Sequence, residues 1–216
     1  MLKLRKHSLS IAAGAVFALW AAGASAATYT LQQLTDGSVT SFTSDDGSLT
    51  FSNFDVTKIK KLNGDLSLYT VTTLSDGFAL SSSEFAANSG GLRKLDLSYT
   101  VSATAGSIVD ALLNMDATRT SGRAKVEKDI EDPLSDEGTF LLALLTGNTS
   151  VLTDSDTLGS GIASFDVEEA IRIKKVSTIN SIENRYTVVP EPGTLALLGF
   201  GLAGLAWTGR RRTVRA

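Results

Sequence analysis

Cysteine is absent from the 216-residue sequence, and histidine occurs only once, at His7. The missing thiols exclude disulfide bonds, iron–sulfur clusters, zinc–thiolate sites and cysteine nucleophiles. His7 lies in a terminal segment that we expect to be removed. The body of the chain therefore has no histidine for a Ser-His-Asp triad, a general base or a transition-metal site. These absences argue against the commoner enzyme chemistries.

Aromatic residues are also few, and the two tryptophans, Trp20 and Trp207, lie near the two ends of the chain. Sugar-binding sites usually use an exposed tryptophan or tyrosine as a stacking platform, whereas we expect most of the remaining rings on core faces. Paired carboxylates can hydrolyse glycosides without histidine, but the sequence shows no aromatic-lined context for such a pair. A carbohydrate-active enzyme is therefore an alternative, and weak carbohydrate binding fits the sequence better than catalysis.

The first 26 residues contain the three parts of a secretory signal peptide. Three basic residues precede an apolar run at 9–22, and the small residues of Ala24-Ser25-Ala26 form a cleavage motif. The sequence therefore predicts cleavage after Ala26 and a mature chain that begins at Ala27.

The last 28 residues contain a proline-bracketed acid, a short apolar run and an arginine cluster. Pro190 and Pro192 fix their own φ and keep the stretch around Glu191 extended, so that an enzyme cleft can grip it. The apolar run at 194–207 has 14 residues, fewer than the roughly 20 that span a bilayer as a helix. Local bilayer thinning or snorkelling arginines would make up the difference, and the arginines at 210–212 are expected in the cytoplasm.

Together, Pro190-Glu191-Pro192, the Leu- and Gly-rich run at 195–206 and the arginines at 210–212 resemble the PEP-CTERM sorting signal. All three parts occur in order in about the last eighth of the chain: Pro190, Glu191, Pro192, the apolar run, then Arg210, Arg211 and Arg212. The resemblance implies recognition by an exosortase, a membrane-embedded cysteine transpeptidase that removes the tail near the motif. It also implies a Gram-negative bacterium that produces exopolysaccharide.

Positive charge flanks the outer side of both apolar segments, so both termini are expected to begin in the cytoplasm while the middle is exported. This divides the chain into a signal peptide (1–26), an exported domain (27–189) and a sorting signal with a short transmembrane helix and an Arg-rich tail (190–216). The exported domain keeps 13 basic and 22 acidic residues, a net charge of −9, which repels nucleic acid. We expect the secretion machinery and an exosortase as partners, exopolysaccharide as a further candidate, and the cell envelope or the extracellular space as the destination.

Short alternating segments separated by Gly, Asp, Asn and Ser run through the body and predict an all-β domain. Strands are expected at 48–54, 66–72, 78–80, 95–101, 107–113, 123–130, 162–167, 170–176 and 182–188, with a fully buried strand or short helix at 140–145 and a helix or turn at 30–37. Apolar faces are expected to contain Leu66, Leu68, Thr70 and Thr72; Leu95, Leu97, Tyr99 and Val101; and Ala124, Val126, Lys128 and Ile130. The pattern is typical of an antiparallel β-sandwich or jelly roll, here flanked by an N-terminal signal helix and a C-terminal membrane helix.

Two segments of the body carry a second resemblance. The segment 47–54, Gly-Ser-Leu-Thr-Phe-Ser-Asn-Phe, is similar to one near the start of many PEP-CTERM proteins, although Ser48 stands where that pattern usually has Asp. The strand at 95–101 resembles their central strand. This resemblance implies an all-β secreted domain whose biochemical role is generally unassigned.

Acidic residues supply the only candidate metal ligands. Asp154-Ser155-Asp156, followed by Gly159, places carboxylates in an expected flexible loop at 155–161, where Ca²⁺ is a possible ligand. The segment lacks the third spaced ligand and the distal glutamate of an EF-hand, so a solvated turn without any cofactor is the simpler interpretation. Asp166, Glu168 and Glu169 are expected to cap or flank a strand, and residues 88–91 to form a second flexible stretch.

We therefore expect a non-enzymatic exported protein of the envelope or extracellular matrix, sorted by an exosortase. The alternatives are a carbohydrate-active enzyme and a calcium-stabilised adhesive module.

Overall fold

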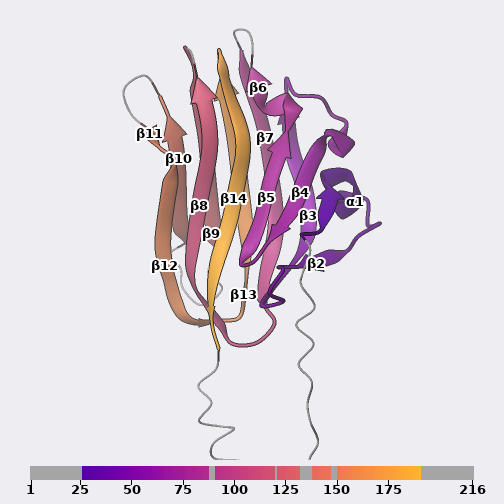
Figure 1. Ribbon diagram of the computed structural model, residues 1–216, viewed down its shortest axis with the longest axis vertical. Coiled ribbons are helices and arrows are strands. Elements are labelled where there is room, and N and C mark those ends of the chain that lie inside the picture. Colours follow the sequence, from indigo (N-terminus) through magenta and orange to yellow (C-terminus); the bar gives the residue numbers. More distant parts are fainter. Residues whose placement is uncertain (1–25, 88–90, 120, 132–137, 147–149, 191–216) are drawn as a thin grey trace, which may run out of the picture.

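The computed structural model describes residues 26–87, 91–119, 121–131, 138–146 and 150–190. These residues form two antiparallel sheets that pack face to face (Figure 1). The first, here called the β14 sheet, has the order β1 (Thr28–Thr30), β4 (Tyr69–Leu74), β5 (Gly77–Ser82), β14 (Ser177–Val189), β8 (Ser107–Arg119) and β12 (Thr153–Ile162), with β6 (Ala86–Ala87) paired to β14. The second, here called the β13 sheet, has the order β11 (Ser150–Val151), β10 (Thr139–Leu145), β9 (Arg123–Glu131), β13 (Ser164–Lys174), β7 (Leu92–Ala103), β3 (Leu49–Lys60) and β2 (Ser41–Thr43). The predicted all-β antiparallel sandwich is confirmed.

Helices are short and peripheral. The α-helix α1 (Leu31–Thr35) begins at a capping box in which Thr30 accepts from the Gln33 N–H and the Gln33 side chain accepts from the Thr30 N–H. Two 3-10 turns, η1 (Leu66–Leu68) and η2 (Ser83–Phe85), precede β4 and β6. The helices predicted for the two ends of the chain fall outside the described residues. Within the part that is described, no helix has the length and apolar character needed to cross a bilayer.

Apolar residues alternate along the central strands and fill the space between the sheets. Leu95, Leu97, Tyr99 and Val101 of β7 are buried, as the sequence predicts. The predicted face of β9 is buried as well, and it includes the charged residue Lys128. Because successive side chains of a strand point to opposite faces, this alternation places one residue in two in the core.

Stacked aromatic rings form the centre of the core. The Phe42 ring lies 5.2 Å from the Phe51 ring in a stacked arrangement, and the Phe51 and Phe78 rings meet edge to face at 5.1 Å. The Phe54 ring stacks on Tyr99 at 5.3 Å. The predicted placement of most aromatics on core faces is confirmed, and such pairs add about 0.5–1.5 kcal/mol beyond their burial.

Four local predictions are wrong. At 66–72 the chain first makes the turn η1, in which Asp65 accepts from the Ser67 N–H, and β4 begins only at Tyr69. The buried face is therefore Tyr69, Val71 and Thr73 rather than Leu66, Leu68, Thr70 and Thr72. A shift of one residue inverts both faces of a strand.

The segment 140–145 is also not buried on both faces. It forms β10, in which Leu141 and Ala143 are buried while Phe140 is 53% exposed. Each sheet of a sandwich has only one covered face, so an apolar run must leave half of its side chains outside. The segment expected to be a loop at 155–161 lies in β12, and β13 runs without a break through the gap expected at 168–169.

Both ends of the folded domain leave the sandwich at the same end (Figure 1). The hairpin β4–β5 turns at Ser75 and Asp76, and Thr28 of β1 pairs with Thr72 close to that turn. Arg185 of β14 pairs with Gly77 just after the turn, and β14 continues beyond it to Val189. The start of β1 and the end of β14 therefore both lie toward the end of the sandwich that contains the β4–β5 turn.

Candidate functional site

The outer face of the β13 sheet contains a groove that crosses β7, β13 and β9. Its central cavity measures about 280 Å³. Two further cavities, of about 350 and 250 Å³, share lining residues with it and extend it toward the two ends of the strands. We call these three cavities the outer groove; the side chains that line its centre are Thr57, Ser98, Glu127, Asp129, Phe140, Glu168 and Arg172.

Charge is sorted along the outer groove. At one end, basic residues gather, and Glu127 forms ion pairs with both Lys125 and Arg172. At the other end, carboxylates dominate, and Asp166 accepts a hydrogen bond of 2.6 Å from the Thr100 hydroxyl. Ion-paired side chains at one end, and carboxylates that form no ion pair with any described residue at the other, give the groove a polarity along the strands.

One exposed aromatic ring lies at the edge of the outer groove. Phe140 is 53% exposed on β10, beside the carboxylates of β9. An exposed ring next to hydrogen-bonding groups is the arrangement that orients an amphipathic ligand. The sequence analysis missed this ring because it treated 140–145 as a continuously buried run.

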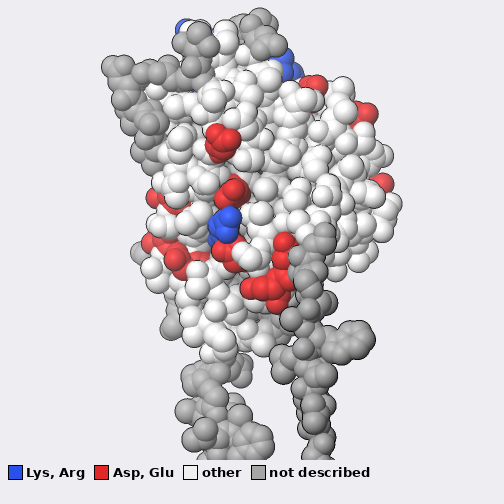
Figure 2. All heavy atoms as spheres, in the orientation of Figure 1, with Lys and Arg blue, Asp and Glu red and all other residues white. Residues whose placement is uncertain are grey.

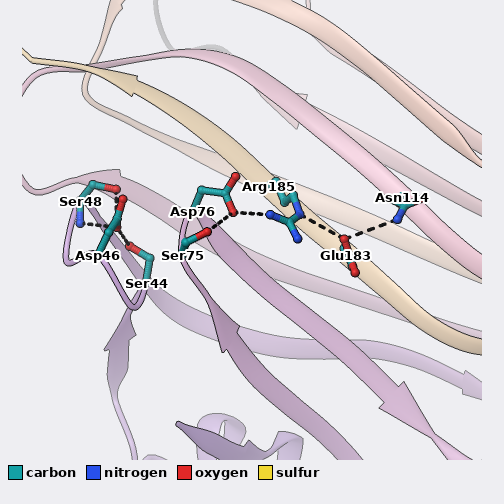
Figure 3. A network of polar contacts seen from close by, with 8 residues as sticks. All are labelled: Ser44, Asp46, Ser48, Ser75, Asp76, Asn114, Glu183 and Arg185. Carbon is teal, nitrogen blue, oxygen red and sulfur yellow. Dashed lines mark hydrogen bonds and ion pairs between the residues drawn. The ribbon is translucent and has the colours of Figure 1, made fainter. Parts of the chain in front are cut away.

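The outer face of the β14 sheet carries a polar network around Arg185. Acidic side chains gather on this face around a basic one (Figure 2). Arg185 donates to Asp76 at 2.8 Å and to Glu183 at 3.1 Å, and Glu183 also accepts from Asn114 at 3.4 Å (Figure 3). The network connects β8, β14 and the β4–β5 turn and so stabilises this side of the sheet.

A nearby turn holds Asp46 against two serines (Figure 3). Its carboxylate accepts from the hydroxyls of Ser44 and Ser48, each at 2.7 Å, and from the Ser48 N–H at 2.9 Å. Partial burial acts to raise the pKa of Asp46, but these hydrogen bonds outweigh it and lower the pKa. The turn therefore stays charged and ordered at neutral pH.

Five polar residues meet inside the core, and of these the sequence predicts Lys128 and Tyr99 on core faces. Lys128, Glu169, Tyr99, Tyr186 and Asn184 are each at most 2% exposed, and we call them the buried polar cluster. Glu169 is the cross-strand partner of Lys128. The prediction that Glu169 caps or flanks a strand is wrong, because it lies mid-strand on the inner face of β13.

Hydrogen bonds connect most of the cluster across the two sheets. The hydroxyls of Tyr99 and Tyr186 lie 3.0 Å apart, and the Tyr99 hydroxyl donates to Glu169 at 3.5 Å. The Lys128 amine donates to the Tyr186 hydroxyl at 3.4 Å and lies 4.6 Å from the centroid of its ring. One Glu169 oxygen and both side-chain atoms of Asn184 have no hydrogen-bond partner among the described residues.

Burial decides the protonation of this cluster. Desolvation lowers the pKa of Lys128 to about 7, against the opposing attraction of Glu169. Desolvation also raises the pKa of Glu169, although the Lys128 charge and the nearby Asn184 and Tyr99 side chains act to lower it. Both shifts favour the neutral forms, as expected where charges lose their water.

The predicted sorting and cleavage residues lie at or beyond the edges of the described chain. Ala26 and Pro190 are exposed. Ala24, Glu191, Pro192 and Arg210, Arg211 and Arg212 fall outside the described residues.

The expected calcium ligands lie in a strand. Asp154 and Asp156 belong to β12, and Asp154 accepts a 2.8 Å hydrogen bond from the Leu142 N–H of β10 in the other sheet. Within the described ranges, no three His, Cys, Asp or Glu side chains are grouped so that they could hold a metal ion. The calcium interpretation depended on a glycine-containing loop at 155–161. This loop prediction is wrong, because the segment belongs to β12.

The chain was compared with known proteins. The family model of the PEP-CTERM protein-sorting motif matches residues 188–212. No curated protein matches the sequence. Among solved structures, the chain is similar to TmCBM61 in complex with beta-1,4-galactotriose, with 12% identity over 65% of this chain and 88% of that one and a TM-score of 0.33.

Two further structures of carbohydrate-binding modules are similar at lower scores. One, from a study of promiscuous specificity in the β-sandwich superfamily, is 11% identical over 65% of this chain and 57% of that one, with a TM-score of 0.26. The other, a mutant of the family 29 module CBM29-2, is 14% identical over 61% and 91%, with a TM-score of 0.20.

The matched motif begins inside the fold. Its first residues, Val188 and Val189, are the last two residues of β14. The motif implies that the protein is exported and that an exosortase sorts and processes it. The chain therefore carries the PEP-CTERM protein-sorting signal at residues 188–212.

Proposed function

We propose that this chain is a non-enzymatic protein that an exosortase delivers to the cell envelope or the extracellular matrix, where the outer groove binds exopolysaccharide weakly. The observation that carries the first part is the match of the sorting motif at 188–212, which begins with the last two residues of the last strand. The position of both domain ends at one end of the sandwich supports it, because a precursor held at both ends presents that end to the membrane.

The outer groove supports the second part. It lies on the flank of the sandwich, along β7, β13 and β9, and not at the end where the chain enters and leaves. Carboxylates and hydroxyls can accept and donate hydrogen bonds to sugar hydroxyls, and Phe140 offers an apolar ring face. A single ring and an open groove favour weak rather than tight binding.

Delivery is tested by changing Pro190-Glu191-Pro192 to three alanines in the native host. Cell fractions are then analysed by intact-mass measurement. We expect the wild-type protein to lack both terminal segments and the variant to remain in the membrane fraction with its C-terminal segment attached. The proposal would be contradicted if the variant lost its C-terminal segment as the wild-type protein does. Full-length wild-type protein in the cytosol would also contradict it.

Binding is tested with exopolysaccharide purified from the same host. We expect the processed protein to be retarded in affinity electrophoresis through gels that contain the polysaccharide, without any shortening of the polymer. Equal mobility with and without the polymer would contradict the binding proposal, and release of oligosaccharides would favour a carbohydrate-active enzyme instead.

A further inference from the structure

The buried polar cluster places an amine, a carboxamide and a carboxyl group together in a site that excludes water. Lys128 reaches inward from β9 and Asn184 from β14, in opposite sheets, while Glu169 lies on β13 beside Lys128. The proposed function gives these groups no task. Buried polar side chains normally form hydrogen bonds, so the Asn184 amide, neither of whose polar atoms has a partner in the described part of the chain, requires an explanation.

The amine and the carboxamide lie close together by register. The Lys128 amine lies 3.4 Å from the carbonyl oxygen of Leu112 on β8. Leu112 pairs with Arg185, the residue directly after Asn184 on β14. The lysine side chain therefore crosses the core and ends against β8, the strand next to β14, one register position from the pair that Leu113 forms with Asn184.

Glu169 lies close to both groups. It is the register partner of Lys128, and the Asn184 side chain is close enough to influence its pKa although it makes no hydrogen bond within 3.5 Å. Its second oxygen is free of partners among the described residues. A carboxyl group in this position can exchange protons with both neighbours.

We propose that the side chains of Lys128 and Asn184 join in an intramolecular isopeptide bond, with Glu169 as the acid–base group of the reaction. The neutral Lys128 amine attacks the side-chain carbonyl carbon of Asn184, and a carbon–nitrogen bond forms while the Glu169 carboxyl donates its proton to the carboxamide. Glu169 then takes a proton from the attacking nitrogen, the original carbon–nitrogen bond of Asn184 breaks, and ammonia leaves. An amine and a primary amide thus become a secondary amide and ammonia, with no oxidation and no co-reactant.

The protonation states and surroundings suit this reaction. Burial lowers the pKa of Lys128 to about 7, so a large fraction of the amine is unprotonated and nucleophilic near neutral pH. Burial raises the pKa of Glu169, which keeps a proton available for transfer. Tyr99 and Tyr186 enclose the groups, and a dry site protects the reaction from hydrolysis.

The bond would link the two sheets covalently at their centre, between β9 and β14. A chain without cysteine cannot form disulfide bonds after export. An amide cross-link would constrain the fold as a disulfide bond does, and reducing agents would not break it.

Peptide mapping of the processed wild-type protein tests the proposal, and it does not depend on where the ends are cut. We expect tandem mass spectrometry to find one branched peptide in which Lys128 and Asn184 are joined, lighter than the two linear peptides together by one ammonia. Recovery of both linear peptides with unchanged masses would overturn the proposal. Loss of ammonia from Asn184 in a linear peptide, the mark of a succinimide, would also overturn it.

Two single substitutions, at Glu169 and at its neighbour Glu168, test the role of Glu169. Glu169→Gln keeps the size of the side chain but cannot exchange the proton, and we expect at least a tenfold lower yield of the branched peptide, with the far-ultraviolet circular dichroism of a folded β protein. Glu168→Gln alters the exposed neighbour on the same strand and should leave the yield unchanged. A wild-type yield in folded Glu169→Gln would remove Glu169 from the reaction.

Discussion

Lys128 and Glu169 lie directly opposite each other on β9 and β13, and both are buried between the sheets. No ion pair within 4.0 Å joins them among the described residues, so each loses its water without gaining a close partner of opposite charge. This relationship explains why burial drives both groups toward their neutral forms. It also has consequences for the dependence of stability on pH.

An Asn184→Ala variant, whose Lys128 amine stays free, is expected to become more stable as pH rises from about 7 toward the ordinary lysine value of 10.5. The folded pKa is depressed, so the unfolded state binds more protons in this window and stability rises through it. The slope is at most about 1.4 kcal/mol per pH unit for one proton. Glu169 acts in the opposite direction at lower pH: its raised pKa stabilises the fold below 4.5, and this contribution is lost as pH rises through the folded value.

Urea denaturation of this variant at a series of pH values measures the effect. The control is the double variant Asn184→Ala/Lys128→Met, which lacks the amine and should show no rise between pH 7 and 10.5. Tyr99 and Tyr186 face the same site, but their pKa values are raised by burial, so they do not titrate in this window. If the free energy of unfolding rose equally with pH in both variants, a group other than Lys128 would be responsible.

Phe140 and Leu141 are adjacent on β10 but face opposite sides. Phe140→Ala should change the free energy of unfolding by no more than about 0.5 kcal/mol, because the ring is 53% exposed. Leu141→Ala should cost about 2–5 kcal/mol, because this side chain is buried. We expect Phe140→Ala to abolish retardation by the polysaccharide, and unchanged retardation would exclude the ring from the binding surface.

Asp154 is expected to stabilise the edge of the sandwich without a metal ion. Its carboxylate accepts from the Leu142 N–H, so Asp154→Ala leaves that donor unpaired and should cost about 1–3 kcal/mol. Asp154→Asn keeps an acceptor and should cost less. Thermal unfolding with and without EDTA completes the test: equal melting temperatures are expected, and a lower one in EDTA would support the calcium-stabilised alternative.

The nitrogen of the expected mature N-terminus already forms a hydrogen bond in the folded domain. The Ala27 nitrogen donates to the Thr73 hydroxyl at 2.8 Å, and this hydroxyl donates to Asp45. Cleavage after Ala26 would turn this nitrogen into an ammonium group beside the carboxylate. We expect Asp45→Asn to destabilise the processed protein by about 1 kcal/mol more than the uncleaved chain, because hydrogen bonds to charged groups are the stronger ones.

Chemical denaturation of both forms measures this difference. Asp46→Asn is the matched control, because among the described residues the Asp46 carboxylate accepts hydrogen bonds from Ser44 and Ser48 of its own turn and not from the N-terminus. It should weaken the two forms equally. An equal loss for Asp45→Asn would mean that the new terminus gains nothing from this contact.

Local chemistry made part of the fold predictable. The strand 95–101 alternates without interruption, and the helix at 31–35 has its capping box within four residues, so neither depends on distant contacts. The face of β4 was not predictable in the same way, because the turn η1 shifts the start of the strand by an amount that the apolar pattern does not record. The continuous strand β13 was missed because the acidic pair at 168–169 reads as a break, although Glu169 occupies an apolar position in the alternation of Phe165, Val167, Ile171 and Ile173.

The sequence by itself determined the sorting signal, the all-β class and the absence of thiol and histidine chemistry, because these depend on composition and on short contiguous patterns. Only the tertiary structure decided which polar residues meet. Lys128, Glu169 and Asn184 lie on three strands of two sheets, and their proximity follows from strand register and sheet packing. The outer groove has the same origin, since its side chains come from strands far apart in the chain. Pairing between strands depends on the summed burial of both sheets, which no single segment encodes.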